Sequence, residues 1–215
     1  RLLSLNISGL VTRPKGDTTF TTGIFKKPVD RPLRVTTLGI EGDRVADLKH
    51  DGGPHKAVYA YTSENLQRWQ DELARPDLAP GAMGENLTTQ GIDEADLCIG
   101  DRLAIGDCIL EVSEPRTPCS TLAFAMDDKT FPKVFLASGR TGFYLRVIQE
   151  GTIRAGDAIA PVSRIETGPR IPVAEVSRLM HLAPDDLPGA RRCLELTTLG
   201  PTWRERFEKR LSPTA

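Results

Sequence analysis

Residues 102–112 read Arg-Leu-Ala-Ile-Gly-Asp-Cys-Ile-Leu-Glu-Val. Two apolar runs are joined here by only two residues, Gly106 and Asp107. A link of this length is typical of a β-hairpin, because glycine adopts the positive φ that a tight primed turn requires. The stretch therefore predicts a pair of antiparallel strands at residues 102–105 and 108–112.

Similar runs, each bounded by turn residues, recur on both sides of this hairpin. They cover residues 2–7, 34–38, 57–61, 143–148 and 158–162. This spacing favours a β-sandwich or barrel. Two helices are expected to cover it: residues 64–74, capped by Ser63, and residues 130–138, with Pro132 in the first turn and Gly139 as the stop.

The composition changes after Arg164. Residues 168–172 are expected to form a linker, and three helical patterns follow within residues 170–215. Val173, Val176 and Leu179 share one face, residues 190–199 end at Gly200, and an apolar residue recurs at every fourth position from 203 to 211. These patterns predict a small three-helix appendage.

Charge does not favour a nucleic-acid partner. The chain has 28 basic and 29 acidic side chains, a formal net charge of -1. The most basic segment, residues 203–211, is interrupted by Glu205 and Glu208, so a solvated helix face is the better interpretation than a DNA-reading helix. No apolar run is long enough to span a bilayer and residues 1–9 lack the pattern of a signal peptide, so we expect a cytoplasmic location and no membrane partner.

The four cysteines form no CxxC pair, which argues against a zinc knuckle or a disulfide framework. Cys98, Cys108 and Cys193 lie in apolar patterns and are expected to be buried. Cys119 differs, because it ends the run Pro-Arg-Thr-Pro-Cys directly after a predicted strand. Two prolines stiffen this segment and Arg116 can favour the thiolate. From these residues alone, a functional and a packing role for Cys119 both stay open.

Four further segments combine glycines with charged or polar side chains. Residues 49–56 contain His50 and Asp51, which are candidates to supply or orient a proton, although a polar turn is the alternative. Asn86 follows the glycines of a turn at residues 81–89 that enters a strand, and its side chain offers both donors and acceptors. Residues 23–27 and 138–144 place cations beside glycines, as phosphate sites do, but neither has the spacing of a nucleotide-binding loop.

Taken in order, these segments resemble the MOSC domain family, and within it the bacterial YiiM-like branch with a C-terminal three-helix extension. The motifs that carry the resemblance are Gly23-Ile24-Phe25-Lys26, Leu38-Gly39-Ile40-Glu41-Gly42-Asp43, Gly52-Gly53-Pro54 with Lys56-Ala57-Val58-Tyr59, Gly84-Glu85-Asn86-Leu87, Ile99-Gly100-Asp101, Pro115-Arg116-Thr117-Pro118-Cys119 and Ser138-Gly139-Arg140-Thr141-Gly142.

The resemblance implies a mainly β fold: a MOSC-type β-barrel with covering helices at residues 1–168, followed by a three-helix domain at residues 169–215. The barrel domain is expected to bind the molybdenum cofactor, a molybdenum pterin, with Cys119 as the sulfur ligand of the metal. Matching the motifs residue by residue, the expected cofactor-binding residues are Lys26, Lys56, Asn86, Arg116, Arg140 and Thr141.

Proteins of this branch reduce N-hydroxylated compounds, including hydroxylamino purines, to amines. The resemblance therefore implies a small-molecule N-hydroxylated substrate and, since no flavin or nicotinamide motif is present, a separate electron-donating reductase. The family usually has a histidine directly before Gly-Gly-Pro, where this chain has Asp51. We expect Cys119, Asp51 and His50 to be the catalytic residues, with Asp51 and His50 together delivering the protons. Delivery by His55 is the alternative.

Two other functions stay open for Cys119. The chain is also compatible with a non-catalytic carrier that binds the cofactor, or persulfide sulfur, at this cysteine and passes it on. A third interpretation makes Cys119 the nucleophile of a hydrolase, with His50 as its base. The sequence predicts no particular oligomeric state.

Overall fold

The computed structural model describes residues 1–47, 52–162 and 168–212. The strands are β1 (Leu2–Ile7), β2 (Val11–Lys15), β3 (Thr18–Thr22), β4 (Lys27–Pro28), β5 (Leu33–Thr36), β6 (Gly39–Ile40), β7 (Val58–Thr62), β8 (Leu87–Thr89), β9 (Arg102–Ile105), β10 (Cys108–Pro115), β11 (Phe143–Gln149), β12 (Gly151–Ile153) and β13 (Ile159–Val162). The helices are α1 (Ser63–Glu72), α2 (Ser120–Met126), α3 (Phe131–Ala137), α4 (Val173–His181), α5 (Leu187–Leu194) and α6 (Pro201–Leu211), with a short 3-10 helix η1 at Pro54–Lys56.

The hairpin predicted at residues 102–112 is confirmed. Cys108 pairs with Ile105 across the β9–β10 ladder, and Gly106 in the turn has a φ of 54°. β10 continues to Pro115, three residues beyond the predicted end, because Glu114 and Pro115 still pair with β11. The Pro-Arg-Thr-Pro-Cys segment therefore begins at the last residue of β10, an inner strand of the sheet.

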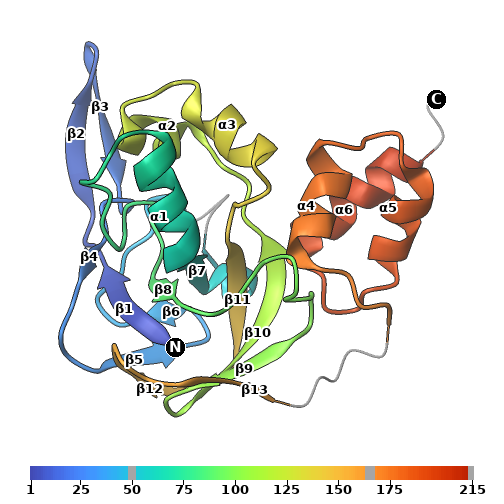
Figure 1. Ribbon diagram of the computed structural model, residues 1–215, viewed down its shortest axis with the longest axis horizontal. Coiled ribbons are helices and arrows are strands. Elements are labelled where there is room, and N and C mark those ends of the chain that lie inside the picture. The colour runs from blue at the N-terminus through green and yellow to red at the C-terminus, as the bar shows by residue number, and fades with distance from the viewer. Residues whose placement is uncertain (48–51, 163–167, 213–215) are drawn as a thin grey trace.

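Every strand region expected from the sequence contains a strand, and most of these strands join one large sheet. Its order is β13-β9-β10-β11-β7-β8-β1-β4, beside a three-stranded sheet β12-β5-β6 and the projecting hairpin β2-β3 (Figure 1). Neighbouring strands are antiparallel except β7 and β8. Within the described residues the large sheet ends in two different strands, β13 and β4, so the closed barrel is not confirmed and the fold is best described as sheet-dominated with covering helices.

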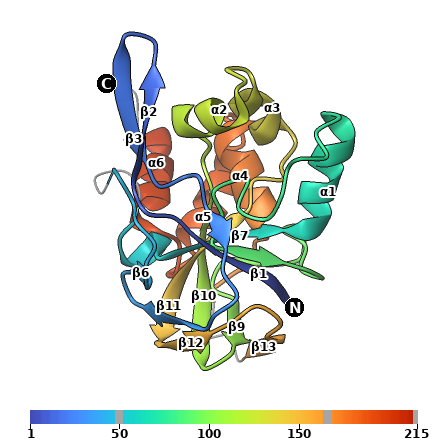
Figure 2. The same ribbon diagram turned by 90° about the vertical axis from the view of Figure 1, so that its left-hand side faces the viewer.

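Helices α1 to α3 lie together over one part of the sheet (Figures 1 and 2). Beneath them is a core of aromatic and aliphatic side chains in which Trp69 contacts Phe131 and Phe135, and Trp69 Nε1 donates to Tyr61 Oη at 2.7 Å. Two details differ from expectation. The cap of α1 is Thr62, whose hydroxyl accepts from Asn65 N at 3.2 Å, rather than Ser63. The short helix α2 was not expected at all.

The three predicted C-terminal helices are present, and they share the main hydrophobic core of the sheet. Val173, Val176 and Phe207 belong to the same buried cluster as Leu97 and Val112. The middle helix begins at Leu187, before the expected residue 190, because the Asp186 side chain caps it by accepting from Gly189 N at 2.8 Å. A domain boundary between residues 168 and 169 stays a prediction.

Backbone bonds reinforce the contact between α4–α6 and the sheet. Ile99 N donates to Ile171 O (3.1 Å) and Val173 N to Leu97 O (2.9 Å). Gly200 N, just before α6, donates to Ser113 O in β10 at 3.0 Å. The start of α6 is therefore tied directly to the strand that leads to Cys119.

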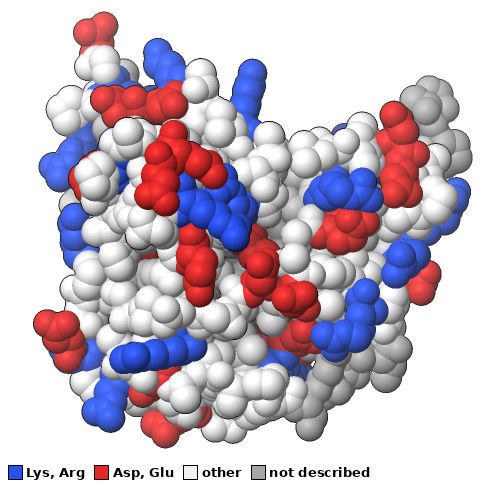
Figure 3. Space-filling view, in the orientation of Figure 1, with Lys and Arg blue, Asp and Glu red and all other residues white. Residues whose placement is uncertain are grey.

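Acidic and basic side chains are interspersed over the face seen in Figure 3, with no large region of one sign. This agrees with the formal net charge of -1. Among the helices of the described chain, none combines the length and apolar character needed to cross a membrane.

His181, at the end of α4, is held neutral. Its ring meets that of Trp203 edge-on at 5.5 Å, and its Nε2 is buried with no hydrogen-bond partner in the described part of the chain. Burial, together with the charges of Arg206 and Arg210, lowers the pKa of His181 to about 4.

This neutral histidine predicts a loss of stability in acid. The unfolded chain takes up the His181 proton near the ordinary pKa of 6.5, whereas the folded chain resists it until about 4. The stabilising contribution is therefore complete above pH 6.5 and is lost as the pH falls towards 4. In urea unfolding at a series of pH values, His181→Phe should lose less stability than the wild-type protein over that range; parallel curves would contradict this account.

Candidate functional site

A cavity of about 620 Å³ lies between the end of β10, the loops around β3 and the start of α6. Its lining residues fall within segments 20–26, 43–47, 52–59, 114–121 and 202–206, joined by Gly84, Asn86 and Tyr144. This volume is in the range of small-molecule and cofactor sites. Segments from both ends of the chain therefore build one pocket.

Cys119 lines this cavity from the loop that follows β10. Arg116 N donates to Gly142 O (3.2 Å) at one end of the loop, and at the other end Leu122 N donates to Cys119 O (3.1 Å) as α2 begins. Cys119 is exposed, while the other three cysteines are buried, as the sequence predicts. A ligand in the cavity can thus reach a thiol whose backbone is held on both sides.

Arg116 is buried beside this loop and also lines the cavity. Its Nη1 donates to Tyr59 Oη (3.1 Å) and to Met83 O (2.5 Å), and its guanidinium lies 4.6 Å from the centre of the Tyr59 ring. Burial opposes its charge, but Tyr59, Tyr144 and Cys119 raise the pKa of Arg116 above its usual range. Arg116 is therefore a fixed positive charge near Cys119.

Lys26 and Asn86 meet at Asp43, which the sequence reading did not single out. Lys26 Nζ lies 2.5 Å from both carboxylate oxygens of Asp43, and Asn86 Nδ2 donates to Asp43 Oδ2 at 2.9 Å. Ser8 N also donates to Asp43 Oδ1 at 2.9 Å. Burial lowers the pKa of Lys26, and the Asp43 charge opposes this effect. Lys26 and Asn86 are thus held in place on the cavity wall.

Lys56 is the second lysine of the cavity, and its partner is again a carboxylate. Lys56 Nζ lies 3.5 Å from Glu114 Oε1, the last side chain but one of β10. The first two turns of α6 add Thr202, Trp203 and Arg206 to the lining. The helical extension therefore forms part of the cavity wall.

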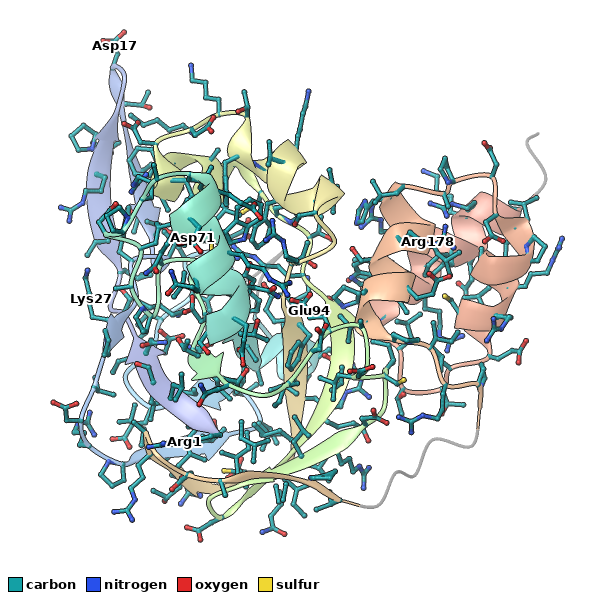
Figure 4. The ribbon with its side chains drawn as sticks, viewed as in Figure 1. Arg1, Asp17, Lys27, Asp71, Glu94 and Arg178 are labelled. Atoms are coloured by element: carbon teal, nitrogen blue, oxygen red, sulfur yellow. The ribbon has the colours of Figure 1, made fainter. Side chains whose placement is uncertain are left out.

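Arg140 and Thr141 are not brought into this cavity. Arg140 makes a two-bond ion pair with Glu72, at 2.9 and 2.6 Å, and lies 4.1 Å from the centre of the Trp69 ring. Thr141 N donates at 3.0 Å to Glu94, a buried carboxylate labelled in Figure 4. Both residues of this motif make contacts that stabilise the fold, so their cofactor-binding role is left as a prediction.

The proton-delivery residues are only partly accounted for. His50 and Asp51 lie outside the described residues. The alternative, His55, is not among the residues that line the cavity; its carbonyl accepts from Ser113 Oγ at 2.6 Å. Burial and the charge of Arg146 lower the pKa of His55, which favours its neutral form.

The comparisons with known proteins agree with this architecture. The sequence model of the MOSC domain matches residues 47–160, and the model described as the YiiM-like, 3-alpha helix domain matches residues 171–212. The chain belongs to the MOSC domain family. The protein YflK of Bacillus subtilis is 36% identical over 209 residues, which cover 97% of this chain and 93% of that protein.

A solved structure and a larger protein extend the comparison of this MOSC protein. The crystal structure of YiiM from Geobacillus stearothermophilus has a TM-score of 0.82 and 32% identity, covering 99% of both chains. A protein of Gibberella moniliformis named "Reductase" is 35% identical over 179 residues, 82% of this chain but 31% of that protein. MOSC domains are associated with molybdenum-cofactor binding, and an oxidoreductase-type function is consistent with these relatives.

Three residues of the cavity were missed by sequence reasoning. Asp43 stands inside a quoted motif, and Glu114 directly precedes the motif that contains Arg116 and Cys119. A carboxylate within a cation-rich motif is a usable signal, because buried lysines need partners. Arg206 gave no such signal, since its place on the cavity wall depends on how α6 packs.

Proposed function

We propose that this MOSC protein is a molybdenum-cofactor-dependent oxidoreductase that reduces N-hydroxylated compounds, such as hydroxylamino purines, to amines. The observation that carries the proposal is an exposed cysteine, Cys119, on the wall of a cation-lined cavity of about 620 Å³. The family membership and the name of the Gibberella relative support an oxidoreductase.

The cavity residues fit the cofactor in chemistry and size. A thiolate is a soft donor of the kind that molybdenum accepts alongside the sulfurs of the pterin. The pterin carries a phosphate, and the cavity wall has five cationic side chains among the described residues: Lys26, Arg44, Lys56, Arg116 and Arg206. Cys119 would hold the metal, and these cations would face the phosphate and the polar ring edges.

When bound, the cofactor supplies the two electrons that cleavage of an N–O bond requires. The protein contributes position and charge. Arg116, fixed by Tyr59 and Met83, keeps a positive charge on the wall of the cavity that Cys119 also lines. Asp43 anchors Lys26 and Asn86, so that their donors are oriented before a ligand arrives.

The proposal includes two expectations about the surroundings of the enzyme. A separate electron-donating reductase would restore the reduced state after each turnover, because no flavin or nicotinamide motif was found in the sequence. A cytoplasmic location suits four cysteines that are all free thiols.

The test is to express the chain in a host that makes the cofactor and then to measure molybdenum and pterin in the purified protein. The holoprotein should reduce a hydroxylamino purine when given a chemical reductant. Holoprotein that lacks turnover but passes its cofactor to an apo-enzyme would favour the carrier function instead. Metal-free protein with thiol-dependent ester or amide cleavage would favour the hydrolase.

A further inference from the structure

Glu114 is unlike the other buried carboxylates of the chain. Its side chain is 1% exposed and lines the cavity, yet neither oxygen accepts a hydrogen bond from the described residues. Glu85, by contrast, accepts from Gly81 N (2.6 Å), Met83 N and Thr88 Oγ1. A buried carboxyl without such donors is costly to maintain, so the place of this side chain on the cavity wall calls for a functional reason.

The chain packs positive charge around Glu114 from three elements. Lys56 of η1 lies 3.5 Å from Oε1, and the charges of Arg146 in β11 and Arg206 in α6 also act on the carboxyl. A Cβ atom at position 200 would meet Glu114 Oε2 where it now lies, so the carboxyl packs directly against the backbone of Gly200. Room for the carboxyl is therefore built into the contact between the sheet and α6.

These surroundings give Glu114 access to both of its protonation states. Burial raises the pKa of Glu114 to about 7, while Lys56, Arg146 and Arg206 pull in the opposite direction and limit the rise. A general acid works best when its pKa lies near the working pH, since it then holds a proton and can also release it. Strongly shifted carboxyls in clefts are common at functional sites.

We propose that Glu114 is the acid that protonates the departing oxygen of the N-hydroxylated substrate, and that Lys56 is a positioning residue that stabilises the carboxylate left behind. This inference rests on the proposed function. It assigns proton delivery to a residue in the same cavity as Cys119, in place of His50 and Asp51.

The reaction balances as one N-hydroxyl group, two electrons and two protons giving one N–H group and water. The N–O bond breaks, Glu114 gives its proton to the leaving oxygen, and the second proton comes from solvent. The two electrons come from the reduced cofactor, which an external electron donor restores. The Glu114 carboxylate then regains its proton from water.

The kinetic test compares wild-type holoprotein with Glu114→Gln, which keeps the shape of the side chain but cannot transfer the proton. We expect kcat to fall about 100-fold or more, KM and molybdenum content to change little, and the pH dependence near 7 to disappear. Glu94→Gln is the matched control: burial also raises the pKa of Glu94 to about 7, but Glu94 lies outside the cavity and accepts from Thr141 N and Gly142 N.

A second readout does not depend on activity. In an infrared pH titration of the protein without substrate, a protonated carboxyl band should titrate near pH 7 and be absent from Glu114→Gln. Glu94→Gln removes the other such band and so assigns both. Lys56→Met removes a nearby positive charge, so the Glu114 band should titrate at a higher pH, and the fall of kcat with pH should move in the same direction.

The outcomes separate the two proposals. If wild-type holoprotein turns over N-hydroxylated substrate but Glu114→Gln keeps the wild-type kcat and pH profile, the role of Glu114 is wrong and the proposed function stands. An infrared band that ignores the Lys56 substitution would overturn the positioning role. If no wild-type preparation with bound cofactor reduces an N-hydroxylated substrate, the proposed function is wrong, and the role of Glu114 as its acid is wrong as well.

Discussion

Replacing Cys119 with serine is expected to abolish reduction of N-hydroxylated substrates while leaving the fold intact. A serine hydroxyl has nearly the volume of a thiol, but it is a hard, weakly acidic donor and a poor replacement for thiolate sulfur. Mutation of residues that hydrogen-bond a metal ligand typically lowers metal affinity or activity by about 10–100-fold. Loss of the ligand itself should therefore lower activity further. Cys119 is exposed, so the free energy of unfolding should change by less than about 0.5 kcal/mol.

The measurements are steady-state kinetics with a hydroxylamino purine, molybdenum content, and urea unfolding. Cys108→Ser is the matched control, because Cys108 is 1% exposed within the β9–β10 hairpin and does not line the cavity. It should lose about 1–3 kcal/mol of stability through burial of a hydroxyl, yet keep its activity for as long as it stays folded. A fully active Cys119→Ser protein would remove the central argument for a molybdenum ligand.

Features that depend on neighbouring residues could be predicted from the sequence. The β9–β10 hairpin follows from one two-residue turn, and α6 from Pro201 and an apolar residue at every fourth position. Other features were not predicted. The short helix α2 was not expected, and the strand that the turn at residues 81–89 enters, β8, pairs in parallel with β7, a partner that no local pattern identifies.

The candidate site was predictable to the same extent. Motifs located Cys119, Arg116 and Lys26, because each stands beside glycines or prolines whose backbone role is local. They also suggested Arg140. The Arg140 guanidinium forms an ion pair with Glu72 in α1, a contact that only the packed structure reveals. The last three helices were interpreted as an appendage, but their side chains contribute to the main hydrophobic core and to the cavity wall. Sequence patterns do not report which surface a helix covers.

Trp203→Ala is expected to destabilise the whole protein by about 3–5 kcal/mol, as large truncations in cores do. Trp203 is 2% exposed, packs on His181 and Phe207, and belongs to the hydrophobic cluster that also contains Val112 of the sheet. It also lines the cavity, so the same truncation should weaken retention of the cofactor. A shared core predicts that the sheet and the three helices unfold together.

Unfolding in urea can test this cooperativity because the chain has two tryptophans. In Trp203→Ala the remaining one, Trp69, reports on the core beneath α1 to α3, while circular dichroism follows all the helices. The two signals should share one midpoint, shifted below that of the wild-type protein. If the three helices were an independent appendage, Trp69 would keep its wild-type midpoint and only part of the helical signal would be lost early. Leu182→Ala, at a position 51% exposed just after α4, should change stability by less than about 0.5 kcal/mol and so separates core loss from any effect of shortening a side chain.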